Sequence, residues 1–494
     1  MTKPKLLLSN LPIKDLTSET DYLGIIDKGD LIKAFLIGNK DQFDEIKMFS
    51  LYGEWGSGKS SLMKYLEKEL KTEFNTFFFE AWEFEKDENL ALSLLEFITL
   101  NDTDITEELY SDILKYGGRI LRGLGKSIKL NIPLYPNGPG VELDPSAFVG
   151  EISKGEELTF YKALENFKTE FIRFEDKITN GNNPKYNIVF IDDLDRCEPE
   201  QVLNLLSAIK LFFTYGEKTI FLCGIDKKAV EQAVKTKYGE IVKSSEYLEK
   251  IFDVSFSMPE HDDLFKLISV YFDSTDYKMS TDIQPINHRI SEFFQYLEFS
   301  NPRRVKKVLN KYQILRNIKL LSLPGKYSQF PNIDEKDKSQ KSYFETILVL
   351  YLIILHEFYP EYFASFLEFN LKSKNYYQSL ERNTTFADKS KTYVRRVIQE
   401  TSFNNYSTTP LVSIPFGDSF SASFSICILP SDVENFNDSI LEDEEEISKI
   451  IIGDNKIEIL FYKYIFENYV NMGKDEFLSD SSFLSIKKLI KNAL

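Results

Sequence analysis

One glycine-rich string constrains this chain more than any other feature. GEWGSGKS, from Gly53 to Ser60, fits the pattern G-x-x-x-x-G-K-[ST]. It follows the apolar run Phe49 to Tyr52 and precedes LMKYLEKEL, whose apolar residues recur at helical spacing. A strand, a glycine-rich loop and a helix in this order place backbone amides and a positive helix end around phosphate groups.

The residue types in the string each have a predicted task. Gly53, Gly56 and Gly58 let the backbone turn successive N–H groups inward. Lys59 brings a positive charge to the β- and γ-phosphates, and the Ser60 hydroxyl binds magnesium. We therefore expect ATP and Mg2+ to be held by the whole loop, which consists of Gly53, Glu54, Trp55, Gly56, Ser57, Gly58, Lys59, Ser60 and Ser61.

Four further hydrophobic runs resemble short strands. They are FNTFFFEAWEF, NIVFIDDLD, TIFLCGID and the end of EYLEKIFDVSFSMP, before Pro259. Because these runs alternate with helical segments, they predict the α/β class, with a parallel sheet wound with helices. Ligands of such sheets bind at the carboxyl ends of the strands, where the motifs of this chain fall.

The run IVFIDDLDRC supplies the acidic partner of the loop. Four apolar residues lead into Asp192, predicted to hold the magnesium, and Asp193, predicted to orient or deprotonate the attacking water. Either assignment is open to a shift of one residue. The alternative for Asp193, and more so for Asp195, is that the carboxylate caps the following helix.

Two more residues have a nucleotide interpretation and a structural one. Arg196 either stabilises negative charge on the transferred phosphoryl group, in its own site or a neighbour's, or forms an ion pair with Asp193 or Asp195. Asp226, at the end of TIFLCGID, either senses the γ-phosphate or caps the helix in KKAVEQAVK.

The string NPRRVKKVLNK predicts a helix with Asn301 as its N-cap and Pro302 at its first position. Val305, Val308 and Leu309 are expected on its apolar face. Its arginines are either solvated or, on a lid, presented to the γ-phosphate, which would couple hydrolysis to domain movement; these candidates are Arg303 and Arg304.

The chain divides into a core at 1–256, a helical lid at 257–320, a polar linker at 321–341 and a mainly helical C-terminal region at 342–494 that recognises a partner. A large insertion, about 87–185, interrupts the core. Its middle, Ile113 to Val141, lacks Asp and Glu and carries several basic residues. It is interpreted either as a glycine-rich surface loop or as a docking patch for a membrane, nucleic acid or acidic partner.

Composition excludes several classes of protein. Lys and Arg total 60 against 77 for Asp and Glu, so any contact with nucleic acid must be through local basic patches. Three distant cysteines predict neither disulfides nor zinc, which favours a reducing cytoplasm.

No secretory signal is seen, and the apolar run Ile347 to Leu355 is too short to span a bilayer and predicts a buried helix. The acidic run Leu441 to Glu446 is expected to be solvated. His261, His288 and His356 show no metal-ligand or triad spacing.

With these motifs in hand, the chain resembles the KAP family of P-loop NTPases. The resemblance rests on GEWGSGKSSL, FEAWEFEK, IVFIDDLDRCEPE, GIDKKAV, EYLEKIF and NPRRVKKVLN, within about Asp21 to Tyr312. It implies an additional-strand P-loop ATPase with a helical lid that works as a homo-oligomer, and bacterial members look like components of defence against phage or other mobile DNA. Some members carry transmembrane helices between the two nucleotide motifs, where this chain has only the basic segment.

Three functions are compatible with these features. The first is an ATPase whose nucleotide state switches a conformation or an assembly that includes a protein partner or effector. The second is a motor that remodels nucleic acid, which the acidic charge balance disfavours. The third is a scaffold that binds ATP with little turnover. A GTPase is disfavoured because no N-K-x-D motif follows the glycine-rich loop.

Overall fold

The computed structural model describes most of the first 320 residues and parts of the remainder. The described residues are 7–87, 89–100, 107–129, 142–143, 160–180, 184–239, 244–259, 264–272, 286–321, 340–361, 363, 411–416, 422–427, 457, 460–461, 464 and 488–494. His261, the acidic run Leu441–Glu446 and most of the predicted linker lie outside them. The chain forms two compact units, Leu11–Glu260 and Met1–Asn10 with His261–Leu494, and each is described by itself.

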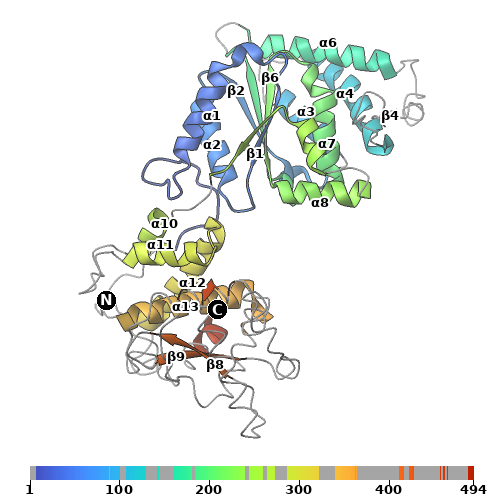
Figure 1. Cartoon of the computed structure of the whole chain (residues 1–494). Helices are drawn as coiled ribbons and strands as arrows, with labels where there is room; N and C mark the ends of the chain where they lie inside the picture. The colour runs from blue at the N-terminus through green and yellow to red at the C-terminus, as the bar shows by residue number, and fades with distance from the viewer. Residues whose placement is uncertain are drawn as a thin grey trace. The chain divides into compact units, whose positions relative to one another are not determined.

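The first unit is built on a parallel sheet of five strands (Figure 1). The strand order is β2-β5-β6-β1-β7. The strands are β1 (Met48–Tyr52), β2 (Asn75–Glu80), β5 (Asn187–Asp192), β6 (Thr219–Ile225) and β7 (Val254–Ser257). Every pairing between them is parallel. All five predicted strands are thus confirmed, and the α/β class with them.

Side-chain alternation divides the core of this unit between the two faces of the sheet. Ile188 and Phe190 of β5 belong to one apolar cluster, and Val189 and Ile191 belong to the other. The three central strands β1, β5 and β6 are buried almost throughout. Such nearly continuous hydrophobic runs are typical of parallel strands covered by helices on both faces.

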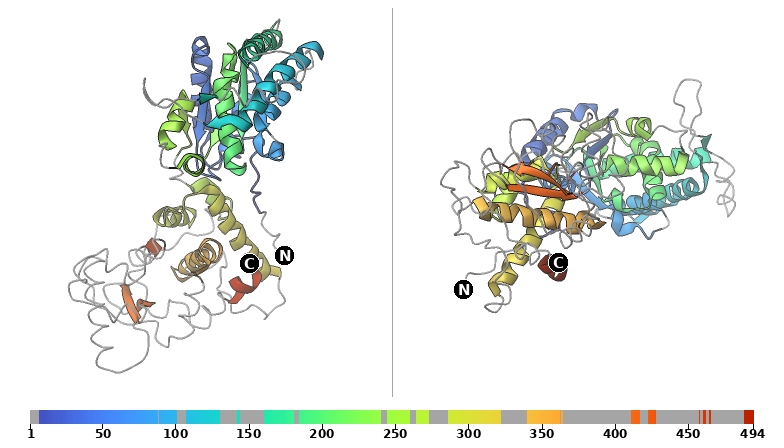
Figure 2. Two further views of the ribbon diagram at one scale, coloured as in Figure 1. Left: turned by 90° about the vertical axis from the view of Figure 1, so that its right-hand side faces the viewer. Right: turned by 60° about the horizontal axis from the view of Figure 1, so that its bottom comes forward.

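Helices form a layer on each face of the sheet (Figures 1 and 2). One layer contains α1 (Ile26–Gly38) and α2 (Lys59–Leu70). The other contains α3 (Leu90–Leu100), α4 (Glu107–Ser127), α6 (Phe160–Ile178), α7 (Pro199–Leu211), α8 (Lys227–Tyr238) and α9 (Ser244–Ile251). Short 3-10 turns occur at η1 (Lys40–Gln42), η2 (Ala81–Phe84), η3 (Leu194–Arg196) and η4 (Phe213–Tyr215). The arrangement is a three-layer wound fold.

The insertion extends the second helical layer. Its helices α3, α4 and α6 pack on one another, and α3 and α4 also pack on α7. Ile113 and Ile120 of α4 are fully buried. The interpretation of 113–141 as a surface loop is therefore wrong for 113–127, which form a helix with an apolar face. Strands β3 (Ile128–Lys129) and β4 (Glu142–Leu143) follow, and 130–141 lie outside the described residues.

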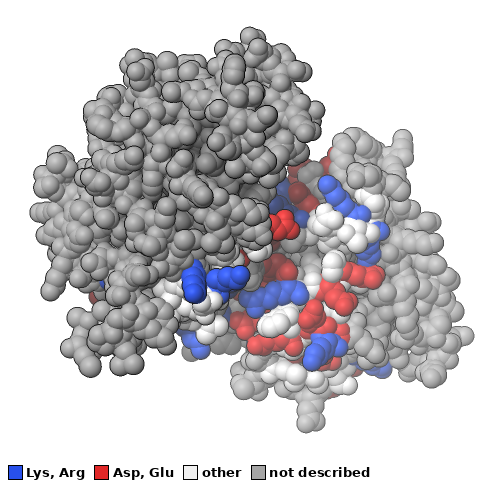
Figure 3. All heavy atoms as spheres, turned by 90° about the horizontal axis from the view of Figure 1, so that it is seen from below, with Lys and Arg blue, Asp and Glu red and all other residues white. Residues whose placement is uncertain are grey.

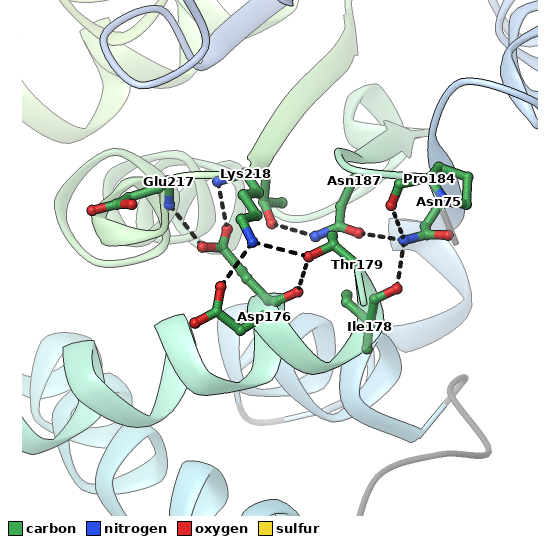
Figure 4. Close-up of polar contacts among 10 residues, drawn as sticks. Asn75, Asp176, Ile178, Thr179, Pro184, Asn187, Glu217 and Lys218 are labelled. Carbon is green, nitrogen blue, oxygen red and sulfur yellow. Dashed lines mark hydrogen bonds and ion pairs between the residues drawn. The ribbon is translucent and has the colours of Figure 1, made fainter. Parts of the chain in front are cut away.

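A buried polar network fastens α6 to the amino end of the sheet (Figure 4). The amide of Asn75, the first residue of β2, donates to Asn187 of β5 at 2.9 Å, and Asn187 donates to Thr219 of β6 at 3.1 Å. The Glu175 carboxylate of α6, which is 1% exposed, accepts from the backbone N–H groups of Glu217 and Lys218. Burial raises the pKa of Glu175.

Gly216 lies against this network and provides a test of it. A Cβ atom added there would lie 2.5 Å from Cδ of Glu175, whose carboxylate is held in place by backbone amides. We expect Gly216→Ala to destabilise the fold by about 1–3 kcal/mol through overpacking. Gly38→Ala, at a helical site with no heavy atom within 4 Å, is the control and should be neutral or stabilising. Equal urea midpoints for the two variants would contradict the expectation.

The second unit is mainly helical among its described residues. It contains α10 (Phe265–Ser269), α11 (Ile286–Tyr296), α12 (Pro302–Leu321), α13 (Gln340–Phe358) and an antiparallel pair, β8 (Leu411–Phe416) and β9 (Ala422–Cys427). Residues 347–355 of α13 are fully or almost fully buried, which confirms the predicted buried helix. Asn301 accepts from the backbone N–H of Arg304, as expected of an N-cap. The boundaries between lid, linker and C-terminal region stay predictions.

Candidate nucleotide site

The glycine-rich loop joins β1 to α2 at the carboxyl edge of the sheet. Gly56 and Gly58 have φ of 87° and 99°, in the left-handed region that glycine adopts without strain. A Cβ at Gly53 would lie 2.5 Å from Oγ of Ser57, so a larger residue there would force its neighbours to move. The Lys59 ammonium is buried and donates to the carbonyl oxygens of Gly53 and Glu54 at 2.8 and 3.2 Å. The first residues of the loop thus curl around its lysine.

The next part of the site is Asp192, which lies close to the start of α2. It is the last residue of β5 and is 2% exposed, and Ser60 and Lys59 at the start of α2 are close enough to its carboxylate to act on its ionisation. Burial raises the pKa of Asp192, while Ser60 and the charge of Lys59 oppose that rise. The structure brings together the two residues to which the sequence assigned magnesium.

The strand order separates the two motifs by one strand. β6 pairs with β1 on one side and β5 on the other. This is the additional strand that the resemblance implied, and the prediction is confirmed. Gly224 of β6 lies beside Asp192, since a Cβ there would be 3.1 Å from the Asp192 Oδ1 atom. The sheet therefore leaves room for the carboxylate.

Asp193 has an uncommon backbone conformation and a raised pKa. Its φ of 58° places it in the left-handed region, uncommon for a residue other than glycine. Its carboxylate pairs with Arg196 at 3.1 Å, while the N-cap position of α7 falls to Glu198. Burial, and after it the charge of Asp192, raises the pKa of Asp193 to about 6. A carboxylate poised there suits proton transfer better than an ordinary one.

Arg196 forms the ion pair that was one of its two interpretations. Its guanidinium also lies over the ring of Trp82, with Cζ 5.2 Å from the ring centroid. Arg196 is 30% exposed, so it is neither buried nor fully solvated. A role toward phosphate stays a prediction.

Asp226 links the loop to α8. Its Oδ1 atom accepts from the backbone N–H of Lys228, as a helix cap, and its Oδ2 atom accepts from the N–H of Trp55 at 3.1 Å. Lys228 pairs with Glu54 at 2.7 Å. The structure thus gives Asp226 its capping role and a second contact, with the loop itself. Sensing of the γ-phosphate stays a prediction.

A family model decides the identity of the part of the chain that holds these motifs. The model of the KAP family P-loop domain matches residues 39–319, more than half of the 494-residue chain. The chain belongs to the KAP family. The match covers both nucleotide motifs and NPRR, so the KAP domain spans the sheet and the helices α10 to α12.

Two relatives of this KAP chain are archaeal and of uncharacterised function. Protein MJ0182 of Methanocaldococcus jannaschii is 38% identical over 173 residues, which cover 30% of this chain and 88% of that protein. Protein MJ0181 of the same organism is 27% identical over 260 residues, which cover 50% of this chain and all of that protein. A structure of Drosophila ORC bound to GC-rich DNA and Cdc6 aligns with 99% of this chain and 83% of its own, at 11% identity. Its TM-score of 0.25 is too low to say anything of this chain's fold or partners.

The residues present at the KAP site fit a magnesium nucleotide. Among the described residues, no group of three or more His, Cys, Asp and Glu could hold a metal without help. Magnesium characteristically binds through one or two carboxylates, waters and substrate phosphates. Asp192 and Ser60 would supply such a partial shell, and Lys59 with the loop amides would supply the phosphate contacts.

Arg303 and Arg304 belong to the second unit. Arg303 donates to the carbonyl of Asn10 at 3.3 Å, and the Arg304 guanidinium lies 5.6 Å from the ring centroid of Phe358. Val305, Val308 and Leu309 are fully buried, which confirms the apolar face of α12. The predicted role of the two arginines toward the γ-phosphate remains a prediction.

Sequence reasoning missed Glu80 and Trp82. Glu80 ends β2 directly beside Asp192 in the register, pairs with Lys64 of α2 at 2.7 Å, and its charge adds to the rise in the pKa of Asp193. The sequence did contain a signal for Glu80, because FNTFFFE is a hydrophobic run ending in a carboxylate, like the run before Asp192. Trp82 carried no comparable signal.

Proposed function

We propose that this KAP chain hydrolyses ATP with Mg2+ and uses the nucleotide state to switch its conformation or its assembly with copies of itself and a partner. KAP membership supports nucleotide binding and hydrolysis in general. The choice of ATP, the switch and the assembly belong to the proposal. So do a role in defence against phage or mobile DNA, which the resemblance implies, and a setting in the reducing cytoplasm, which the buried thiols of Cys197 and Cys223 favour.

One observation carries the proposal furthest. Ser60 and Lys59, at the start of the loop's helix, lie close enough to the carboxylate of Asp192 to act on its pKa, although Asp192 ends a strand two places away from β1 in the sheet. Residues distant in sequence thus converge where a magnesium ion would bridge loop and strand. Asp193 then lies one residue beyond, with Arg196 beside it. This order of groups supports hydrolysis and not binding alone.

The test is turnover of ATP by the whole chain with magnesium. Phosphate release should require Mg2+ and fall to background when EDTA removes it, because the protein supplies only a partial metal shell. GTP should be hydrolysed more slowly. The mass of the particle, measured with ATP and with ADP, should differ if assembly follows the nucleotide. Wild-type turnover no higher than the EDTA background would overturn the enzyme assignment.

Nucleic acid is an arm of the same test. On the face shown in Figure 3, acidic and basic side chains of the described residues lie interspersed, without an extended basic surface among them. The net charge of -17 points the same way. We expect turnover to be the same with and without DNA. A large increase with DNA would favour the motor over the switch.

Among the described helices, none combines the length and the apolar composition needed to cross a membrane.

A further inference from the structure

Trp82 lies beside the proposed catalytic residue Arg196 and is half exposed. It lies in η2, the turn that follows β2, and β2 is paired with β5 so that Glu80 faces Asp192. Trp82 is two residues beyond Glu80, and its turn η2 contacts η3, the turn that contains Arg196. The Trp82 side chain is 50% exposed although the site lies at the edge of a large apolar core.

The turn is anchored without Trp82. Ala81 is fully buried, and the ring of Phe84 stacks on Phe79 at 4.8 Å and meets Phe97 edge-on. Gln201 of α7 donates to the carbonyl of Glu85 at 3.2 Å and fixes the far end of the turn. The exposed indole is therefore not needed to hold η2 in place.

What the indole does contact is the guanidinium of Arg196. Cζ lies 5.2 Å from the ring centroid, within the range of a cation–π interaction. The same guanidinium pairs with Asp193 at 3.1 Å. Arg196 is therefore held from two sides, by an uncharged aromatic face and by a carboxylate.

We propose that Trp82 is a positioning residue for the reaction, which holds Arg196 at the γ-phosphate end of the site and, through it, the Asp193 carboxylate. The inference rests on the proposed ATPase function. An aromatic face suits this task because it attracts the guanidinium without neutralising it, so the charge stays available to a phosphoryl group. An acidic residue in its place would compete with the phosphate for Arg196.

The kinetic test compares Trp82→Leu with Trp82→Phe. Leucine keeps an apolar side chain and removes the π-face, so we expect kcat to fall about three- to thirtyfold with KM for ATP unchanged within about twofold. Phenylalanine keeps a π-face and should restore most of the rate. Tyr215→Leu is the matched control, because it removes the ring beneath Lys168, 5.5 Å away, at the opposite end of the sheet, and should leave turnover unchanged.

The spectroscopic test does not depend on turnover. The chain has 2 tryptophans, so Trp55→Phe leaves Trp82 as the only one. In that background, Arg196→Ala should increase acrylamide quenching of Trp82, because the guanidinium no longer covers one face of the ring. Unchanged quenching would show that the contact is not made in solution and overturn the inference.

Failure of this inference and failure of the proposed function can be told apart. A wild type that hydrolyses ATP, together with Trp82→Leu at the wild-type rate or with Leu and Phe variants equally slow, overturns the positioning role alone. A wild type without turnover overturns both. A fall in the urea midpoint of Trp82→Leu that matches its loss of rate would assign the residue to stability.

Discussion

Lys59→Ala is expected to lower kcat/KM for ATP by about a hundredfold or more, the usual effect of removing a charge that stabilises a phosphoryl transition state. The Lys59 side chain is buried at the start of α2, and its ammonium is already directed into the loop, toward the carbonyls of Gly53 and Glu54. No other described ammonium makes these two contacts. Its removal takes positive charge from the place where the β- and γ-phosphates would lie.

Two measurements check this expectation. Phosphate release gives the rate, and the melting temperature with and without MgATP gives binding, because a ligand at about 100 times its Kd stabilises the fold by about 2.7 kcal/mol. Lys68→Ala is the matched control: Lys68 lies on the same helix, is 62% exposed and pairs with an exposed Asp15. It should behave as the wild type. A Lys59 variant with normal turnover and a normal thermal shift would remove the basis for the nucleotide site.

The centre of the sheet was predictable because β1, β5 and β6 are buried on both faces. NIVFID and TIFLCGI are short apolar runs that end in a carboxylate or a turn, and such runs are characteristic of central parallel strands. The loop residues followed from their chemistry, since a Cβ at Gly53 would be crowded and the positive φ at Gly58 favours glycine. Local sequence carried enough information for both.

The remainder depended on contacts between distant segments. Residues 113–127 have the glycines of a loop, yet they form α4 because α3 and α6 bury its apolar face, so tertiary packing overrides propensity. The contact of Trp82 with Arg196 joins residues from different strands' ends and has no local signature. The second contact of Asp226, with the N–H of Trp55, likewise depends on the placement of β6 beside β1.

Asp193→Asn is expected to lower kcat about a hundredfold or more, since proton transfer by a positioned side chain typically contributes about that much. Asn retains the shape of Asp and tolerates the left-handed backbone at φ 58°, so the fold should accept it. Asp195→Asn, in the same turn, is the control and should hydrolyse ATP nearly as fast as the wild type. In the wild type, turnover should decline as pH falls through about 6, because Asp193 with its raised pKa becomes protonated there.

Asp193→Asn should also stabilise the protein in the absence of nucleotide. Such a gain in stability would distinguish a catalytic carboxylate from one that serves the fold. Burial and the charge of Asp192 raise the pKa of Asp193 to about 6, so the folded state favours the neutral acid. Its contribution to stability is full below the unfolded pKa of about 4 and is lost as pH rises through 6. At pH 7.5 the ionised group therefore costs up to about 3 kcal/mol, which Asn avoids. Urea unfolding should show Asp193→Asn more stable at pH 7.5 and a smaller difference at pH 5. A variant that is less stable at pH 7.5 would mean that the pair with Arg196 serves the fold, and a variant with normal turnover would favour the nucleotide-binding scaffold.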